Sequence, residues 1–165
     1  MSSALVQTDR LVTVRISDLA ISADPGETII TYALGSCIAV MLWDPKVKLA
    51  GLLHYMLPTA KGSADPTKPP AMFADSGIPL LFEKMYQRGG TKENIAVKVA
   101  GGAAMGGPDL FEIGNRNVTA LRKIFWKNGV LIAAEDVGGS SSRTVSIEVA
   151  TGMVTVRTPE GARNL

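Results

Sequence analysis

The sequence predicts a layered α/β (α+β) sandwich with a mixed, largely antiparallel sheet and two main helices. Stretches with the spacing of strands outnumber those with the spacing of helices, and two helices cannot cover both faces of a doubly wound parallel sheet of this size. The chain has 165 residues, of which 46% are hydrophobic, and no repeat or linker divides it. We therefore expect residues 1–165 to form a single domain around one core.

The N-terminal part is predicted to be almost entirely β-structure, because its apolar residues either alternate with polar ones or run continuously. The expected strands are residues 11–16, 19–23, 27–32, 38–43 and 49–56. The last two are separated by Asp44-Pro45-Lys46-Val47, which has the residue types of a tight turn, so they should form a β-hairpin. Both faces of this hairpin are apolar, which predicts that other elements cover both.

The remaining part is predicted to contain both helices and several further strands. Residues 78–88 should form a helix with Pro79 in its first turn, and residues 117–127 a second helix that ends at Gly129. A short helical turn around residues 73–75 is expected before the first helix. The expected strands are residues 95–100, 130–134, 142–150 and 153–157. The last two should form a closing hairpin.

Three further stretches have more than one interpretation. Residues 59–70 directly follow the strand that carries His54, so they form either a rim over a site or a plain connector. Residues 101–107 contain two glycine pairs, but neither GxGxxG nor GxxxxGK[ST] fits, which favours a backbone-packing loop over a nucleotide-binding loop. Glu135 and Asp136 are adjacent on an expected strand end and diverge to opposite faces, which argues against a cooperating carboxylate pair.

Charge and composition exclude several classes of partner and compartment. The 17 basic and 15 acidic residues leave a net charge of +2 without a lysine or arginine run, so we expect no nucleic-acid partner. A single cysteine excludes an intrachain disulfide. The N-terminus lacks the apolar core of a signal peptide, and no apolar stretch approaches the ~20 residues that cross a bilayer. We therefore expect a cytoplasmic protein without membrane insertion.

The only cysteine, Cys37, and the only histidine, His54, stand at the two ends of the predicted hairpin. If the turn is centred between Pro45 and Lys46, paired residue numbers sum to 91, and Cys37 lies directly opposite His54. A two-residue shift of register would make the two residues diagonal neighbours. A one-residue shift would place them on opposite faces of the sheet.

A thiol beside an imidazole is the arrangement needed for thiol-based acyl transfer. Gly35-Ser36 before Cys37 suits a sharp turn whose N–H groups can converge on an oxyanion. Turn amides and a nearby imidazolium also predict a lowered thiol pKa, with Cys37 partly ionised at neutral pH. The alternative from the residues alone is that Cys37 is an ordinary buried thiol and His54 a structural histidine.

The chain resembles the chemoreceptor glutamine deamidase family (CheD) over nearly its whole length. Several ordered motifs at compatible spacings are more specific than any one of them. The matching segments are Thr31 with Leu34-Gly35-Ser36-Cys37, Asp44-Pro45, Ala50-Gly51-Leu52-Leu53-His54, Met56-Leu57-Pro58, Phe73-Ala74-Asp75, Ile78-Pro79-Leu80-Leu81, Ala100-Gly101-Gly102-Ala103, Ile113-Gly114, Arg116-Asn117, Glu135-Asp136-Val137-Gly138-Gly139 and Arg143-Thr144.

The resemblance implies an α/β sandwich and a protein-glutamine deamidase. It assigns Cys37 as the nucleophile, His54 as the base, and Thr31 as the third catalytic residue, with no metal or organic cofactor. The implied substrates are glutamine side chains in the cytoplasmic region of chemotaxis receptors, which become glutamates with release of ammonia through a cysteine thioester. The family also implies a second partner, a CheC-type chemotaxis phosphatase that competes with receptors.

Two rival functions stay open at this level. The chain could be a non-catalytic regulatory binding module, or another thiol acyl-transfer enzyme such as a protease or a transglutaminase. It also departs from the family pattern at Asn115, often acidic, and after Met105, where Gly106-Gly107 replaces a common apolar or aromatic residue. Those departures bear on substrate or partner contacts rather than on the chemistry.

Overall fold

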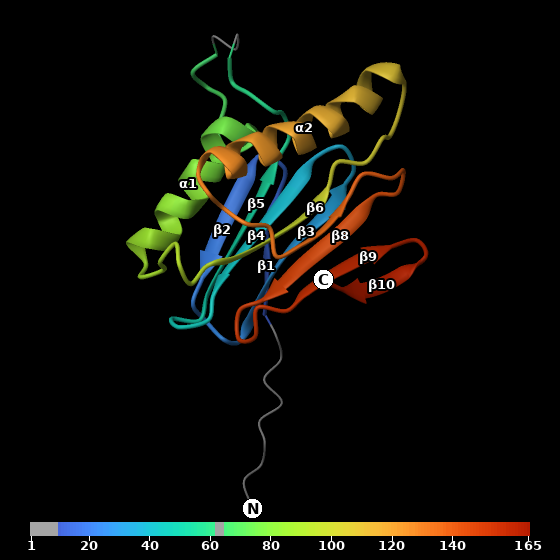
Figure 1. Cartoon of the computed structure of the whole chain (residues 1–165). Coiled ribbons are helices and arrows are strands. Elements are labelled where there is room, and N and C mark those ends of the chain that lie inside the picture. The colour runs from blue at the N-terminus through green and yellow to red at the C-terminus, as the bar shows by residue number, and fades with distance from the viewer. Residues whose placement is uncertain (1–9, 62–64) are drawn as a thin grey trace, which may run out of the picture.

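A computed structural model describes residues 10–61 and 65–165 of the chain. The described residues form two α-helices, one 3-10 helix and ten strands (Figure 1). In chain order these are β1 (Arg10–Thr13), β2 (Asp18–Ser22), β3 (Glu27–Leu34), β4 (Ile38–Asp44), β5 (Leu49–Tyr55), η1 (Pro70–Met72), α1 (Ala74–Gln87), β6 (Ala96–Gly101), α2 (Pro108–Lys127), β7 (Ala134–Val137), β8 (Arg143–Glu148), β9 (Val154–Thr158) and β10 (Gly161–Asn164). Neither α-helix is long and apolar enough to cross a membrane.

The strands form two five-stranded sheets, in the orders β1-β3-β8-β9-β10 and β2-β5-β4-β6-β7. Each sheet has one parallel pair, β1 with β3 and β6 with β7, and its other pairs are antiparallel. The predicted α+β class, with largely antiparallel pairing and two main helices, is confirmed. The strands are divided between two sheets because β3 and β4, although consecutive, pair with different neighbours.

The β4–β5 hairpin is buried on both faces, as its apolar pattern predicts. On one face Leu53 and Tyr55 pack against residues of α1 and α2 such as Leu81 and Leu121. On the other face Met41 and Leu52 belong to a second apolar cluster that includes β3 and β8 residues of the other sheet. Each fully buried large aliphatic side chain contributes roughly 1.5–3 kcal/mol. The hairpin is therefore the central layer of the molecule, with helices on one side and a sheet on the other.

The hairpin register differs from the predicted one. Ala39 pairs with His54 and Asp44 with Leu49, so paired numbers sum to 93 rather than 91 (39 + 54). The loop has four residues, 45–48, because Asp44 accepts a hydrogen bond from the Lys46 N–H and Lys48 adopts a positive φ of 49°. Lysine is not a residue type that favours positive φ, so the sequence does not predict this conformation. The expectation that Cys37 lies directly opposite His54 is wrong, and the two-residue shift holds.

Both helices begin earlier than predicted. α1 starts at Ala74 rather than residue 78, which places Pro79 inside the helix, and the short helical turn lies at Pro70–Met72 rather than around residues 73–75. α2 starts at Pro108 rather than residue 117, so Gly114 lies inside it. A Cβ at Gly114 would stand 2.6–2.9 Å from the backbone of Gly102 and Ala103. This glycine therefore allows close packing rather than ending the helix.

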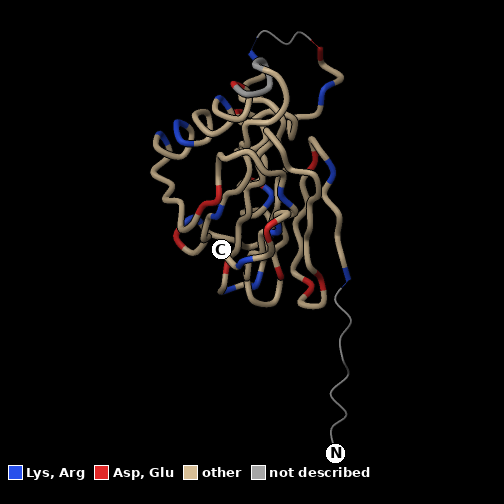
Figure 2. The backbone as a smooth tube through the Cα atoms, turned by 90° about the vertical axis from the view of Figure 1, so that its right-hand side faces the viewer, with Lys and Arg blue, Asp and Glu red and all other residues tan. Residues whose placement is uncertain are grey.

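The remaining differences lie at strand boundaries. The predicted strand at residues 130–134 becomes β7, at Ala134–Val137, and the short strand β10 was not predicted. In the 59–70 loop, residues 62–64 lie outside the described residues, and its choice between rim and connector stays a prediction. Thr59 and Ala60 are tied to the Asp75 carboxylate at the start of α1. Figure 2 shows basic and acidic residues interspersed along the described chain.

Candidate active site

Cys37 lies in the turn that leads from β3 in one sheet to β4 in the other. The turn is held through its backbone: the Ala103 N–H donates to the Gly35 carbonyl at 2.9 Å, and the Gly102 N–H to the Cys37 carbonyl at 2.8 Å. Between them, the Asn117 Nδ2 donates to the Ser36 carbonyl at 2.9 Å. Three successive carbonyl groups are therefore anchored, and the position of the thiol follows from them.

Two glycines, the last residue of β6 and the residue after it, allow this anchoring. Gly101 and Gly102 have φ values of +116° and +67°, which favour glycine. A Cβ on Gly101 would lie 2.2 Å from the Cys37 carbonyl oxygen, and one on Gly102 would lie 2.6 Å from Val118. The loop after β6 thus packs its backbone directly behind the turn that carries Cys37, which is the interpretation that the sequence favoured over nucleotide binding.

His54 lies near the end of β5, between β2 and β4, where it pairs with Asp18 and Ala39. Its side chain is 2% exposed. The Nδ1 atom is 2.7 Å from the Thr31 hydroxyl oxygen, and that hydroxyl donates to the Val14 carbonyl at 2.8 Å. A hydroxyl has one proton to donate, so the Thr31 oxygen accepts a hydrogen bond from His54 Nδ1–H. The remaining nitrogen, Nε2, then carries a lone pair.

The His54 Nε2 atom is buried and has no hydrogen-bond partner. A buried acceptor without a partner is costly in free energy, typically about 1–3 kcal/mol, so its presence calls for a functional reason. An unprotonated imidazole nitrogen held in one tautomer is suited to accept a proton from a nearby acid.

Cys37 and His54 lie on the same face of the β4–β5 layer. His54 pairs with Ala39, and Cys37 precedes Ala39 by two residues, so the thiol is the diagonal neighbour of the imidazole. Diagonal residues in an antiparallel pair are about 7–8 Å apart at Cα and less at Cβ. Cys37 and Ala39 share the apolar cluster between the sheets, and Thr31 reaches His54 from that side. The structure thus brings all three predicted site residues to one place between the two sheets.

Burial governs the protonation of both groups. It raises the pKa of the Cys37 thiol to about 11, although the backbone N–H of Cys37 acts in the opposite direction. It lowers the pKa of His54 to about 4. The expected lowering of the thiol pKa is therefore wrong for the free protein, because removing the thiolate from water outweighs the turn amide. At pH 7 the pair is a neutral thiol beside a neutral imidazole.

Thr31 lies beside a β-bulge in β3. The pairing of β3 with β8 shifts register between Thr31 and Leu34, and Ala33 has a positive φ of 54°. Bulges re-aim side chains and are common next to active sites. The irregularity interrupts the ladder after Thr31, and pairing resumes at Leu34 before the chain crosses to the other sheet.

Asn117 of α2 is fully buried and was not predicted to contact the site. Its Nδ2 donates to the carbonyls of Ser36 and Met56, both at 2.9 Å. The backbone carbonyl of Asn117 accepts from the Tyr55 hydroxyl at 2.7 Å. Ser36 precedes Cys37, and Met56 follows His54 by two residues. One side chain therefore joins the turn of Cys37 to the strand of His54. The only sign of this role in the sequence was that Asn117 belongs to the Arg116-Asn117 motif.

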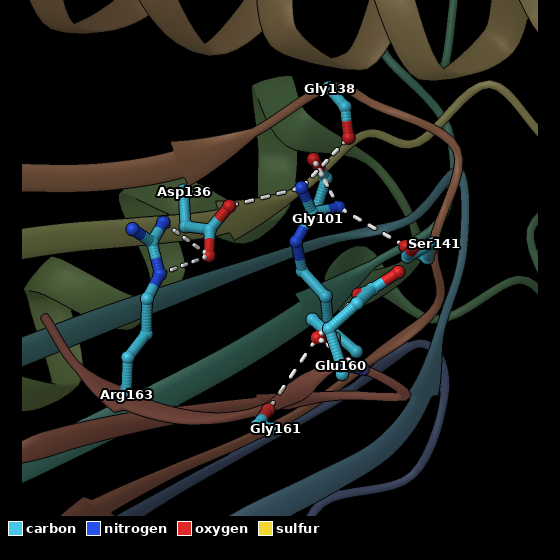
Figure 3. A network of polar contacts seen from close by, with 9 residues as sticks. Gly101, Asp136, Gly138, Ser141, Glu160, Gly161 and Arg163 are labelled. Atoms are coloured by element: carbon cyan, nitrogen blue, oxygen red, sulfur yellow. Dashed lines mark hydrogen bonds and ion pairs between the residues drawn. The ribbon is translucent and has the colours of Figure 1, made fainter.

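Arg143 of β8 supports the same region from the other sheet. Its guanidinium, 6% exposed, donates to the carbonyl of Gly138 at 2.8 Å and to Asp136 at 3.1 Å, and it lies 3.4 Å from the Gly101 carbonyl (Figure 3). Asp136 also pairs with Arg163 of β10 at 2.6 Å. Burial acts to raise the pKa of Asp136, but hydrogen bonds from Arg163 and Arg143 outweigh it and lower that pKa.

The adjacent Glu135 takes a different partner. It forms two hydrogen bonds with Arg122 of α2, and these hold its pKa below the ordinary value. Glu135 and Asp136 thus diverge, as predicted, and do not act as a pair. In the described part of the chain, no three His, Cys, Asp or Glu side chains are grouped closely enough to hold a metal ion.

Comparison with known proteins gives the family. The family model described as "CheD chemotactic sensory transduction" matches residues 56–158, more than half of the chain, starting after the three predicted site residues. A Syntrophus aciditrophicus (strain SB) protein named probable chemoreceptor glutamine deamidase CheD 1 is 51% identical over 152 residues, which cover 91% of this chain and 95% of that protein. The corresponding Anaeromyxobacter dehalogenans (strain 2CP-C) protein, CheD 2, is 48% identical over 89% of this chain and 94% of its own.

A Syntrophotalea carbinolica relative, also named probable chemoreceptor glutamine deamidase CheD, is 47% identical over 87% of this chain and 91% of its own. Among solved structures, a Neisseria meningitidis protein aligns with a TM-score of 0.45 and 9% identity, over 79% of this chain and 62% of that one. A TM-score this low supports no conclusion. The family model and the long, similar relatives are sufficient: this chain belongs to the CheD family.

Proposed function

We propose that this protein is a protein-glutamine deamidase that acts on chemotaxis receptors in the cytoplasm, converting glutamine side chains to glutamate. The names of its relatives support the reaction and the substrate class. One observation carries the assignment of the site: Thr31 accepts a hydrogen bond from His54 Nδ1–H and leaves an unpartnered Nε2 on the face that carries Cys37. The unpartnered Nε2 can accept the thiol proton. Without such a role, its burial would only cost folding free energy.

In the first half of the reaction, the Cys37 sulfur attacks the γ-carboxamide carbon while His54 Nε2 takes the thiol proton. The carbonyl electrons move to oxygen and form a tetrahedral intermediate. When the intermediate collapses, the C–N bond breaks, and the imidazolium gives its proton to the departing nitrogen. Ammonia leaves and a γ-glutamyl thioester remains on Cys37.

In the second half, His54 Nε2 takes a proton from water, and the resulting hydroxide oxygen attacks the thioester carbon. The C–S bond breaks, glutamate forms, and the thiol recovers the proton from His54. Through both halves the Nδ1–H of His54 stays hydrogen-bonded to Thr31, so all proton transfer passes through Nε2. The proposal assigns no role to a metal or an organic cofactor.

The neutral resting pair shapes this mechanism. With a thiol pKa near 11 and an imidazole pKa near 4, proton transfer is unfavourable before substrate binds. The thiolate should form together with bond formation to carbon, when the developing charge moves to the substrate oxygen. His54 is then a general base rather than the cation of a standing ion pair.

The test is incubation of the protein with a receptor cytoplasmic fragment, followed by ammonia measurement and peptide mass spectrometry. We expect glutamine-to-glutamate conversion by the wild-type protein and none by Cys37→Ala. Peptide-bond cleavage would instead favour a protease, and amine incorporation a transglutaminase. Binding without any modification would favour the regulatory module. The proposal includes a CheC-type phosphatase as second partner, whose addition should slow deamidation.

A further inference from the structure

The turn that carries Cys37 is anchored at three successive carbonyl groups, and the middle one is different. The Gly35 and Cys37 carbonyls accept from backbone N–H groups of the loop after β6. The Ser36 carbonyl instead accepts from the side chain of Asn117. Ser36 is joined to the nucleophile by one peptide bond, so the orientation of that peptide depends on Asn117.

Asn117 is itself held firmly. Both protons of its amide are used, one by the Ser36 carbonyl and one by the Met56 carbonyl, and its backbone carbonyl accepts from the Tyr55 hydroxyl. Its Oδ1 is buried without a partner. An asparagine turned the other way would place Oδ1 against two carbonyl oxygens, so the amide nitrogen must face the turn. The donor to Ser36 is therefore fixed in identity and in position.

The geometry of the peptide bond carries the consequence to the thiol. In a planar trans peptide, the C=O and the following N–H point in opposite directions. No cis peptide occurs among the described residues. Because the Ser36 carbonyl points at Asn117, the Cys37 N–H points away from it. The N–H belongs to the same residue as the sulfur and acts against the rise in the thiol pKa that burial causes.

We propose that the backbone N–H of Cys37 is an oxyanion-hole donor and that Asn117 is the positioning residue that orients it. The inference rests on the proposed acyl-transfer function. As the sulfur bonds to the carbonyl carbon, the carbonyl electrons move to oxygen, and this oxyanion forms within reach of the nucleophile's own amide. A preoriented amide stabilises that charge without reorganisation, and one such donor changes kcat by about 10²–10³-fold.

The test compares two reactions of the same thiol. Acylation by p-nitrophenyl acetate passes through a tetrahedral oxyanion before p-nitrophenolate leaves, whereas iodoacetamide alkylates sulfur by displacing iodide and forms no oxyanion. A change in the thiolate fraction affects both rates alike and cancels in the ratio of acylation to alkylation rates. Because only acylation forms an oxyanion, a large change in this ratio reports the oxyanion hole. The ratio needs no receptor. Its outcome is therefore independent of whether receptor deamidation is observed.

Asn117→Asp replaces the donor with an acceptor of the same shape. We expect the acylation-to-alkylation ratio to fall about 10²-fold. Asn128→Asp is the matched control: Asn128 ends the same helix, and its Nδ2 also donates to a backbone carbonyl, that of Ile124, at an exposed position. This control should keep the wild-type ratio. With receptor fragment as substrate, Asn117→Asp should lower kcat with little change in KM.

An unchanged ratio in Asn117→Asp would overturn the proposal, as would a wild-type thiol that alkylates readily but is not acylated. If the variant does not fold, an NMR measurement on the wild-type protein still tests the proposal. The chain has one cysteine, so 15N-cysteine labelling gives a single amide resonance, that of Cys37. Addition of propionaldehyde, which forms a thiohemiacetal with the thiol, should shift that amide proton downfield. No shift on adduct formation would reject Cys37 N–H as the donor.

Discussion

The nucleophile and the base of the candidate site are positioned by different kinds of structure. Cys37 lies in irregular backbone, and its place depends on a glycine loop and one buried asparagine. His54 lies on a regular strand with neighbours on both sides, and its ring is oriented by Thr31 from the other sheet. A strand ladder fixes backbone position well, whereas an irregular turn can also aim an N–H at a reacting atom. The irregular turn therefore suits the proposed nucleophile, and the regular strand suits the proposed base.

The largest effect should follow from removing either reacting group. Cys37→Ala and His54→Ala should each abolish ammonia release from a receptor fragment, and the double variant should be no worse, because members of one catalytic unit fail together. Thermal unfolding checks that each variant folds. Substantial turnover by Cys37→Ala would show that the thiol mechanism is wrong.

The next largest effect concerns His54, which lies on the regular strand, and the Thr31 hydroxyl that orients it. Thr31→Val keeps shape and strand preference but removes the acceptor for His54 Nδ1–H, so kcat should fall about 10²-fold, less than for Cys37→Ala. Two buried groups, His54 Nδ1–H and the Val14 carbonyl, also lose their partner. This should cost about 1–3 kcal/mol of unfolding free energy. Thr31→Ser should recover part of both, and a fully active Thr31→Val enzyme would remove Thr31 from the site.

The class of fold could be predicted because it depends on patterns along the chain, and the same patterns singled out the three candidate site residues. Strand-like apolar runs, helix ends and the spacing of Cys37 and His54 are local features, and the family motifs added Thr31. The register of the hairpin could not be predicted, because the positive φ of Lys48 lengthens the turn and no residue type announces it. The two-residue shift kept Cys37 and His54 on one face, so the error in register does not separate the two candidate residues.

Features that depend on tertiary burial were missed. The pKa of Cys37 rises because both sheets exclude water from it, and the sequence suggested only the amides of the turn. The predicted helix began at residue 117, whereas α2 begins at Pro108 and holds Gly114 where the loop after β6 approaches. Asn117 belongs to a recognised motif, but its two acceptors, Ser36 and Met56, come from segments far away in the chain.

A glycine comparison tests the irregular half of the site. Gly101→Ala places a Cβ 2.2 Å from the Cys37 carbonyl at a φ of +116°, whereas Gly107, at the other end of the segment that leads from β6 to α2, has a φ of −73° and open space around it. Gly101→Ala should lose about 1–3 kcal/mol from backbone strain alone, and more from displacement of the turn. Gly107→Ala should lose less, within about 1 kcal/mol, because Gly107 is only the N-cap of α2. Urea unfolding measures both, and equal effects would contradict a packed loop behind Cys37.

The smallest effect is a pH dependence of stability that separates the two halves of the site. The pKa of His54 falls from its ordinary 6.5 to about 4 on folding, so between these values the unfolded chain binds a proton that the folded protein does not. Stability is therefore lost as pH falls through this window, by about 1 kcal/mol between pH 7 and pH 5.5. His54 is the only histidine, so His54→Gln should remove this loss. A slope that persists in His54→Gln would assign it elsewhere.

Cys37 should act in the opposite direction. Its pKa rises from 9.0 to about 11 on folding, so between these values the folded protein keeps a proton that the unfolded chain releases, and stability is lost as pH rises. Burial also raises the pKa of Tyr55, which adds to the loss above pH 10. Cys37→Ala should therefore reduce the alkaline loss, most of all between pH 9 and pH 10, and leave the acid one, while His54→Gln should do the reverse. Urea unfolding of the two variants across both pH windows measures each half independently. If either substitution flattened both limbs, the thiol and the imidazole would titrate as one coupled pair rather than as two separately buried neutral groups.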